Sequence, residues 1–437
     1  MVNHAMVTVI VPVHNSEKYL RECLRSAVIQ TFNEIEILCI DGGSRDLSPE
    51  IIKEFQEKDS RIELIEDSNT GYGHKLNVGI GRARGKYIMV LESDDRMCPN
   101  MIECLYTIAE QYGVDIADSD YYELFHHKGY EYKHKKNKYE IPEMYNCLLT
   151  NRGRDEKSIA SFGIWTALYR KAFIEEQNIS FNESEGASFQ DTSFLFMTSM
   201  FADSVYHLSL PLYQYRIDNT GSSVKDDKKL FEIVGEFEFL RHNLERRHIW
   251  DDGAWKLYYA RKYNAFYWNY CRLTPASREL FLEKYLRELD LDIRNMAINR
   301  TMFEGIMYNR TFLVVDDTDQ FVNWAVATEE RTWKEAFCNL LDRVENRKIV
   351  VFGTGVVGSR LIDILQQGEN QIVGLCDNSE AVQGTLRNGI LVCSVAKTVE
   401  RYRNAIYIIA SRYHTDEMKR QLTEEGIEEK EIIIFSR

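Results

Sequence analysis

The first 95 residues alternate between apolar runs of strand length and longer stretches with helical periodicity. The apolar runs are residues 7–11, 35–40, 62–65 and 86–91. Between them, apolar side chains recur at helical spacing from about Ser16, Ser48 and Gly73, and Pro12 is expected to end the first strand. Strand–helix–strand repetition with short connections predicts an α/β domain around a parallel sheet.

The rest of the chain divides into two further parts. Residues 96–225 have a mixed pattern that continues the first domain. Residues 228–345 carry apolar and aromatic stripes at helical spacing, which are more typical of a helical core than of a cofactor site. Alternation of strands and helices then resumes. We therefore predict an α/β domain over 1–225, a helical segment over 226–345 and a small Rossmann-like α/β domain over 346–437.

The composition excludes several classes of protein. The chain has 437 residues, of which 44 % are hydrophobic, and its net charge of −14 argues against a nucleic-acid partner. No apolar run approaches the roughly 18 residues that span a bilayer. The nine cysteines are scattered without a C-x-x-C pair, which predicts reduced thiols in the cytoplasm. The N-terminal residues have no basic region before an apolar one, so no signal peptide is expected.

Acidic side chains follow two strands of the predicted parallel sheet. Asp41 comes directly after the second strand, and Glu92-Ser93-Asp94-Asp95 follows the fourth. Ligands of such sheets bind at the carboxyl ends of the strands. Since Mg²⁺ combines few protein carboxylates with several phosphate oxygens, the acidic run is a candidate clamp for a metal–diphosphate. An acidic turn without a ligand is the alternative.

Five motifs in order make the first half of the chain resemble glycosyltransferase family 2, whose members use nucleotide sugars and have the GT-A fold. They are VIVPVHN (9–15), IDGGSRD (40–46), NTGYGHKLN (69–77), ESDD (92–95) and QD (190–191). The resemblance covers about residues 6–225. Four positions depart from the family pattern. Gly42, Glu92 and Gln190 each replace a common acidic residue, and His14 replaces a common tyrosine.

The resemblance implies roles for individual residues. Asp41 would accept the imide hydrogen of the base, which favours uracil, and Asp191 would be the general base. Asp94 would bind a divalent cation, Mg²⁺ or Mn²⁺, with Glu92 beside the metal or the ribose. Trp165 would lie near the acceptor, although a core tryptophan is an equal alternative, and Asp191 could also cap its helix. The remaining donor-binding candidates are Pro12, His14, Asn15, Glu17, Lys75, Asn77, Ser93 and Arg216.

These roles predict an inverting, metal-dependent hexosyltransferase. It would move a sugar from a nucleotide-diphosphate donor, a UDP-sugar, to a glycan or polyprenyl-diphosphate-linked acceptor in cell-surface polysaccharide synthesis. The basic stretch at 126–138 would then face lipid head groups in a peripheral contact at the inner face of the membrane. A solvated hairpin is the alternative for that stretch. The sequence does not predict the oligomeric state.

A glycine-rich loop opens the last domain. Gly353, Gly355 and Gly358 follow a strand and precede a helix, and Asp377 ends the next strand. This context is typical of an NAD(P)-binding fingerprint, but the domain also resembles small Rossmann-like modules of polysaccharide-biosynthesis proteins. Two other functions therefore stay open: a nucleotide-sugar oxidoreductase or epimerase that uses this loop, and a non-catalytic glycan-binding scaffold.

Overall fold

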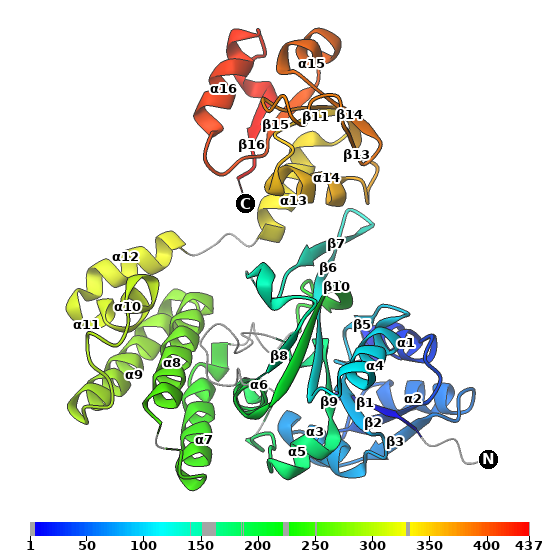
Figure 1. The fold of residues 1–437 in the computed structure, drawn as a ribbon, viewed down its shortest axis with the longest axis vertical. Coiled ribbons are helices and arrows are strands. Elements are labelled where there is room, and N and C mark those ends of the chain that lie inside the picture. The colour runs from blue at the N-terminus through cyan, green and yellow to red at the C-terminus, as the bar shows by residue number, and fades with distance from the viewer. Residues whose placement is uncertain are drawn as a thin grey trace. The chain divides into compact units, whose positions relative to one another are not determined.

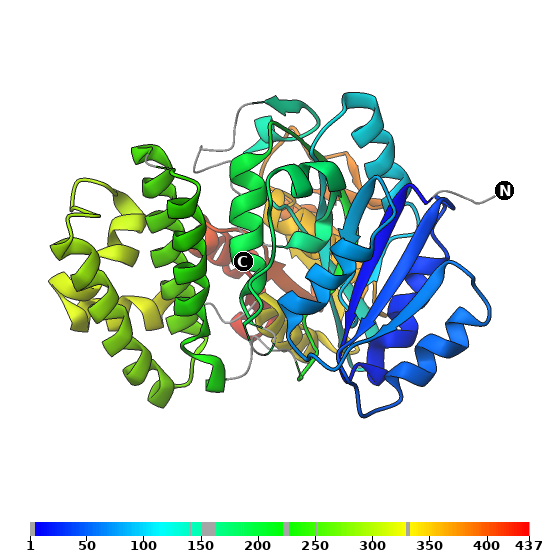
Figure 2. The same ribbon diagram turned by 90° about the horizontal axis from the view of Figure 1, so that it is seen from below.

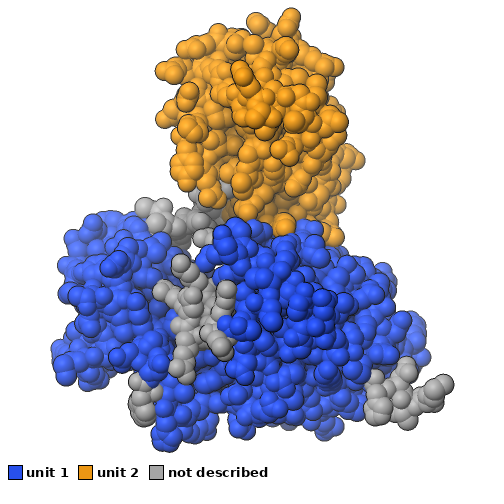
Figure 3. All heavy atoms as spheres, in the orientation of Figure 1, with its two compact units in different colours: residues 1–122, 136–329 blue, residues 123–135, 330–437 orange. Residues whose placement is uncertain are grey.

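The computed structural model describes residues 5–139, 141–150, 163–184, 186, 188–221, 227–249, 251–328 and 333–436. The chain forms two compact units, coloured separately in Figure 3. Unit 1 contains residues 1–122 and 136–329, and unit 2 contains residues 123–135 and 330–437. Each unit is described by itself below.

The first half of unit 1 is a parallel sheet with helices on both faces (Figures 1 and 2). Its strands and helices alternate along the chain: β1 (Val7–Val13), α1 (Glu17–Val28), β2 (Ile35–Asp41), α2 (Ser48–Gln56), β3 (Ile62–Glu66), α3 (Tyr72–Arg82) and β4 (Tyr87–Val90). Every residue of β1 and β2 is buried, as expected for strands covered on both faces. The predicted α/β alternation is confirmed.

One strand boundary was predicted wrongly. We expected Pro12 to end the first strand, but β1 continues through Pro12 to Val13. In the parallel ladder with β2, Pro12 stands opposite Ile40 and Val13 opposite Asp41. Proline lacks only its N–H, so it still fits the extended backbone where the sheet nears its end.

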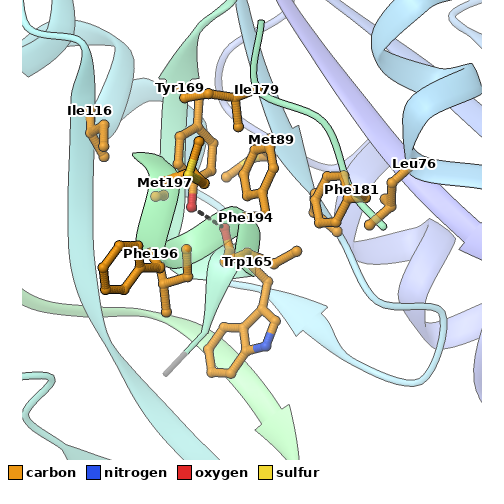
Figure 4. Close-up of a cluster of buried hydrophobic side chains, with 14 of the residues drawn as sticks. Leu76, Met89, Ile116, Trp165, Tyr169, Ile179, Phe181, Phe194, Phe196 and Met197 are labelled. Atoms are coloured by element: carbon orange, nitrogen blue, oxygen red, sulfur yellow. Dashed lines mark hydrogen bonds between the residues drawn. The ribbon is translucent and has the colours of Figure 1, made fainter. Parts of the chain in front are cut away.

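The second half of unit 1 extends the sheet with antiparallel strands. The order is β3-β2-β1-β4-β9-β6-β10-β5, with β8 paired to β10. The added elements are β5 (Arg96–Met97), α4 (Met101–Tyr112), β6 (Ile116–His127), η1 (Pro142–Met144), β8 (Leu148–Thr150), η2 (Ile164–Thr166), β9 (Ala167–Arg170), α5 (Lys171–Glu176), α6 (Gln190–Phe201) and β10 (Ser204–Arg216). Figure 4 shows the core in this half, where Phe181 packs beside Leu76 and Phe194.

Helices make up the rest of unit 1. They are η4 (Asp227–Lys229), α7 (Glu232–Arg246), α8 (Asp252–Arg272), α9 (Pro275–Arg294), α10 (Gly305–Thr311), α11 (Leu313–Asp316) and α12 (Thr318–Thr328). Asp251 caps α8, because its Oδ1 accepts the N–H of Ala254 at 3.0 Å. The aromatic stripe of α8 is largely buried, and α7 packs against both α6 and α8.

Unit 2 is a smaller α/β unit with a six-stranded sheet in the order β13-β14-β12-β11-β15-β16. All of its strand pairs are parallel except β13 with β14. Its elements are β7 (Tyr130–Lys136), α13 (Trp333–Val344), β11 (Lys348–Phe352), α14 (Val356–Leu365), β12 (Gln371–Cys376), β13 (Leu386–Arg387), β14 (Ile390–Cys393), α15 (Val395–Tyr402), β15 (Ile406–Ile409), α16 (Thr415–Glu424), η5 (Glu429–Glu431) and β16 (Ile432–Ile434).

Residues 126–135 of the basic stretch belong to unit 2, where they pack on α13. The Nζ of Lys128 lies 2.7 Å from Glu345 Oε2, and His127 Nε2 lies 3.0 Å from Asp342 Oδ1. Tyr132 contacts Phe337 edge to face, with the ring centroids 5.5 Å apart. Lys128 is therefore neutralised by carboxylates of the same unit, and His127 is hydrogen-bonded to one of them.

None of the nine cysteines, all of which lie in the described part of the chain, takes part in a disulfide bond. Among the described residues, every helix falls short of the combined length and apolarity that a membrane span requires.

Candidate active site

Three loops meet at the carboxyl ends of β1, β2 and β4. The N–H of Asn15 donates to Ser44 Oγ at 2.8 Å, and its side-chain oxygen accepts the N–H of Arg45 at 2.8 Å. Glu17 Oε2 accepts the N–H of Leu47 at 2.9 Å. The loop after β1 is thereby tied to the loop after β2, which is the edge where the parallel sheet predicts a ligand.

Further contacts hold the same edge together. The Nδ1–H of His14 donates to the carbonyl of Gly42 at 2.9 Å. Ser16 Oγ and Ser93 Oγ are 2.7 Å apart, which joins the loop after β1 to the turn after β4. Of the donor-binding candidates in these loops, Pro12 is buried within β1, while His14, Asn15 and Glu17 are exposed.

Asp41 is buried at this edge with an incomplete set of hydrogen bonds. Its side chain is 3 % exposed, and Oδ2 accepts the N–H of Ser44 at 3.1 Å. Its Oδ1 is also buried and accepts no hydrogen bond from any described residue. A buried acceptor without a donor costs about 1–3 kcal/mol. The site therefore favours a ligand that brings an N–H group to this oxygen.

Lys75 is buried beside Asp41 and the acidic turn. Burial lowers its pKa, while the charges of Glu92 and Asp41 act in the opposite direction. Its Nζ donates to the carbonyl of Thr70 at 3.0 Å. A Cβ at position 42 would lie 3.1 Å from this Nζ and 2.9 Å from the carbonyl oxygen of Asn69. Glycine at position 42 therefore leaves the space that the Lys75 side chain occupies.

The turn after β4 holds two carboxylates in different environments. Asp94 is partly exposed, and its Oδ2 accepts from the Nδ2 of Asn219 at 2.7 Å. Glu92 accepts a hydrogen bond from the hydroxyl of Tyr72. Burial raises the pKa of Glu92 to about 8, with further increases from the charges of Asp94 and Asp191. Without a compensating cation, this turn therefore favours a protonated Glu92 at neutral pH.

Asp95 and Arg216 hold the turn after β4 in place. Asp95 is buried and accepts from the Tyr213 hydroxyl at 2.9 Å and from the N–H of Arg216 at 2.7 Å. The Arg216 guanidinium donates to the carbonyl of Asp94 at 2.8 Å and to Glu22 Oε2 at 2.7 Å. The structure thus places Arg216 as a brace of the acidic turn.

Asn77 lies on α3 and holds the segment 181–184. Its Oδ1 accepts the N–H of Phe181 at 2.9 Å, and its Nδ2 donates to the carbonyl of Phe181 at 3.0 Å and to Glu183 Oε1 at 2.9 Å. The structure therefore places this donor-binding candidate as a clamp on that segment.

Asp191 lies in the first turn of α6, which begins at Gln190. Phe189 occupies the N-cap position with φ 69°, so Asp191 is not the cap that we considered as an alternative. Burial raises the pKa of Asp191, whereas Arg261 of α8 lowers it. Arg261 was absent from the sequence prediction, because nothing in a helical stripe indicates which residue approaches a carboxylate 70 positions away.

Two tryptophans on which a sugar could pack differ in exposure. Trp165 is 4 % exposed and stacks on Tyr213, with the ring centroids 4.4 Å apart, so it is a core residue here. Trp268 of α8 is 45 % exposed and contacts Phe189 edge to face at 6.0 Å. The guanidinium carbon of Arg272 lies 5.3 Å and 5.8 Å from the centroids of these two rings. The sequence did not indicate that Phe189, Trp268 and Arg272 lie together.

In unit 2, the Asp377 carboxylate accepts hydrogen bonds from the glycine-rich loop itself. Its Oδ2 accepts from the N–H and the hydroxyl of Thr354 at 2.6 and 2.8 Å, and its Oδ1 accepts the N–H of Ser379 at 2.9 Å. A Cβ on Gly358 would lie 1.8 Å from the carbonyl oxygen of Gly353, so helix and loop meet closely there. Gly355 is the N-cap residue of α14, and a Cβ added there would meet open space. NAD(P) binding by this loop stays a prediction.

Comparison with known proteins identifies the class to which this site belongs. A family model described as glycosyl transferase family 2 matches residues 8–176, and a second model, C2185-like, N-terminal, matches residues 345–433. GlyG of Streptococcus pneumoniae, a glycosyltransferase, is 30 % identical over 216 residues, which cover 48 % of this chain and 70 % of GlyG. The chain belongs to glycosyl transferase family 2, and the expected GT-A α/β fold of its first domain is confirmed.

Other relatives match the same part of the chain. The glycosyltransferase GlyA of S. pneumoniae is 34 % identical over 215 residues, which are 48 % of this chain and 30 % of GlyA. EpsH of Bacillus subtilis is 34 % identical over 231 residues, which are 52 % of this chain and 65 % of EpsH. Among solved structures, TarS 1–349 of S. aureus matches with a TM-score of 0.48 and 16 % identity, over 72 % of this chain and 91 % of TarS 1–349.

Proposed function

We propose that this chain is an inverting glycosyltransferase that transfers a hexose from a UDP-sugar to a glycan or lipid-linked acceptor in polysaccharide synthesis. The observation that carries the proposal is the buried, unpartnered Oδ1 of Asp41 at the ligand edge of the sheet. The imide N–H of uracil is a donor of the kind this oxygen lacks. Since guanine and thymine nucleotides also present ring N–H groups, the choice of base is part of the test below.

The acidic turn supports a donor that carries its own cation. In the described part of the chain, no group of three or more His, Cys, Asp or Glu side chains could hold a metal ion. Mg²⁺ and Mn²⁺ with nucleotides commonly use one or two carboxylates and complete their shell with phosphate oxygens and water. Asp94 and Glu92 fit that requirement. A bound cation would supply Lewis-acid stabilisation of the leaving diphosphate.

We assign to Asp191 the role of the general base that takes the proton of the acceptor hydroxyl. The hydroxyl oxygen attacks the anomeric carbon, the bond from that carbon to the diphosphate breaks, and the hydroxyl proton passes to the Asp191 carboxylate. Burial raises the pKa of Asp191, which makes the carboxylate a stronger base, while the charge of Arg261 favours the ionised form. The nucleoside diphosphate leaves on the side of Asp94.

We place the acceptor at Phe189, Trp268 and Arg272. Phe189 is two residues before Asp191, and its ring meets the exposed indole of Trp268. The C–H faces of a sugar pack well on indole, and a guanidinium suits hydroxyl or phosphate oxygens. The nine cysteines, none of which forms a disulfide, support an enzyme that works in a reducing compartment.

A thermal-shift panel tests the proposal directly. UDP-, GDP- and dTDP-sugars are each added with and without Mn²⁺ to the wild type and to Asp41→Asn and Asp191→Ala. We expect a UDP-sugar to raise the melting temperature of the wild type and of Asp191→Ala, but much less that of Asp41→Asn. Hydrolysis of the same donor should fall about 10²–10⁴-fold in Asp191→Ala, to a residual rate that is still measurable. A wild type that responds to no nucleotide sugar would overturn the proposal.

A further inference from the structure

A buried carboxylate on α7 connects two parts of the catalytic half of unit 1. Glu236 is 2 % exposed. Its Oε1 accepts the backbone N–H of Ser193 in α6 at 3.1 Å, and its Oε2 accepts from the Nδ2 of Asn182 at 2.9 Å. One side chain of the helical segment therefore holds both the first turn of α6 and the segment 181–184.

The first turn of α6 receives a hydrogen-bond acceptor from another helix. The first four N–H groups of a helix have no partner within the helix, and a side chain at the N-cap usually accepts from one of them. In α6 that position is taken by Phe189, which has no acceptor, and the described structure shows no side-chain cap there. Glu236 supplies an acceptor from a different helix, because its Oε1 accepts the N–H of Ser193.

The segment 181–184 is tightly confined on its other side. Asn77 of α3 binds both backbone groups of Phe181. A Cβ on Gly73 would lie only 1.9 Å from the carbonyl oxygen of Asn182, so the segment lies directly on α3. Phe181 also stacks on Phe194 of α6, with the ring centroids 4.0 Å apart. Displacement of this segment would therefore disturb α6 as well.

We propose that Glu236 is a positioning residue for Asp191. Ser193 and Asp191 share the first turn of α6, so the hydrogen bond to Ser193 fixes the backbone that carries the Asp191 carboxylate. Through Glu236, α7 is an integral part of the catalytic machinery rather than an appendage to it. This inference rests on the proposed role of Asp191, and it concerns the rate of the chemical step rather than donor binding.

Three variants separate this role from a general effect on folding. Glu236→Ala removes both hydrogen bonds. Glu236→Gln keeps an acceptor for Ser193, and its amide can pair with Asn182 if the Asn182 amide turns over. Glu238→Ala is the matched control, because Glu238 is exposed on the same helix. Each variant is assayed as the full chain for hydrolysis of the UDP-sugar that gives the largest thermal shift, with Mn²⁺, and its thermal unfolding is recorded.

We expect kcat of Glu236→Ala to fall at least tenfold while the donor KM changes less than twofold. Glu236→Gln should recover to within about threefold of the wild type, and Glu238→Ala should match it. In an Asp191→Ala background, Glu236→Ala should cause no further loss of kcat, since residues that act as a unit are not additive. If Glu236→Ala does not fold, Glu236→Gln and Asn182→Ala are compared in its place. Asn182→Ala removes one of the two groups that donate a hydrogen bond to Glu236. We then expect Asn182→Ala to lower kcat without changing the KM for the UDP-sugar.

Several results would overturn the inference while the proposed function stands. They are an unchanged kcat in Glu236→Ala, no recovery in Glu236→Gln, a rise of donor KM that matches the loss of kcat, or an additive loss in the Asp191→Ala background. If Asn182→Ala stands in for Glu236→Ala, an unchanged kcat overturns it as well. A wild type that neither binds nor hydrolyses a nucleotide sugar would instead overturn the proposed function, and this inference with it.

Discussion

The carboxylate of Asp95 accepts the backbone N–H of Arg216 at 2.7 Å, although the two residues are 121 positions apart. The same arginine donates from Nε to the carbonyl of Asp94. The end of β10 thus determines the conformation of the turn after β4, and with it the position of the Asp94 side chain. The metal–diphosphate site that we propose depends on this long-range contact.

Removal of the Asp94 carboxylate should abolish the response to metal. We expect Asp94→Ala to lose the Mn²⁺-dependent part of the UDP-sugar thermal shift and about 10²–10³-fold in kcat, because a charge that stabilises the leaving group is gone. Asp416→Ala, at an exposed position in unit 2, is the control and should behave as the wild type. A chelator should reproduce the Asp94→Ala result in the wild type. An undiminished shift in either experiment would contradict metal-assisted donor binding.

Asp41→Asn should weaken UDP binding without harming the fold. A hydrogen bond to a charged group contributes about 1.5–3 kcal/mol, so we expect the Kd for UDP to rise roughly 10- to 100-fold in isothermal titration calorimetry. The ligand-free variant should be at least as stable as the wild type, because Asp41 Oδ1 is buried without a partner. Equal UDP affinity in the two proteins would remove the main support for the proposed base recognition.

Glu92 should make the ligand-free protein less stable as the pH rises. Its pKa is raised to about 8 in the folded state, so the folded protein binds this proton more tightly than the unfolded chain, whose glutamate has an ordinary pKa near 4.5. The free energy of unfolding therefore loses this contribution between about pH 5 and pH 8 and levels off above it. The measurement is the melting temperature of wild type and Glu92→Gln over that range. As the pH rises, the melting temperature of Glu92→Gln should increase relative to that of the wild type. A difference that stays constant with pH would contradict the raised pKa of Glu92.

Trp268→Ala should affect the acceptor and not the donor. Loss of the exposed indole should raise the acceptor KM about tenfold, a change of roughly 1.4 kcal/mol, while the Kd for UDP stays constant. Leu280→Ala removes another exposed apolar side chain, on α9, and serves as the control. The two variants are compared at saturating donor. An acceptor KM unaffected by Trp268→Ala would place the acceptor elsewhere.

Asp377→Ala should destabilise unit 2 and leave UDP binding unchanged. The variant removes the acceptor for three hydrogen bonds, two from Thr354 of the glycine-rich loop and one from Ser379, so the free energy of unfolding should fall by about 2 kcal/mol. Denaturant unfolding measures this effect, with the exposed Glu380→Ala as the control. A fully stable Asp377→Ala would mean that the carboxylate does not organise the loop.

The parallel half of the sheet could be predicted because its signals are local. Largely apolar runs such as 35–40 and amphipathic stretches such as 17–28 each specify their own element, and short connections restrict the topology. The site residues carried by the loops after these strands followed from their order along the chain. Asp41 and Asp94 are therefore at the sheet edge where the sequence predicted them.

Contacts between distant residues decided the rest. The sequence by itself determined the α/β and helical segments and the family of the first domain, because these depend on periodicity and on short ordered motifs. Only the tertiary structure decided that Trp165 is buried and Trp268 exposed, and that Glu236 and Arg261 of the helical segment act on α6. Burial and pairing of this kind arise from packing between elements, and residue spacing within one element does not specify them.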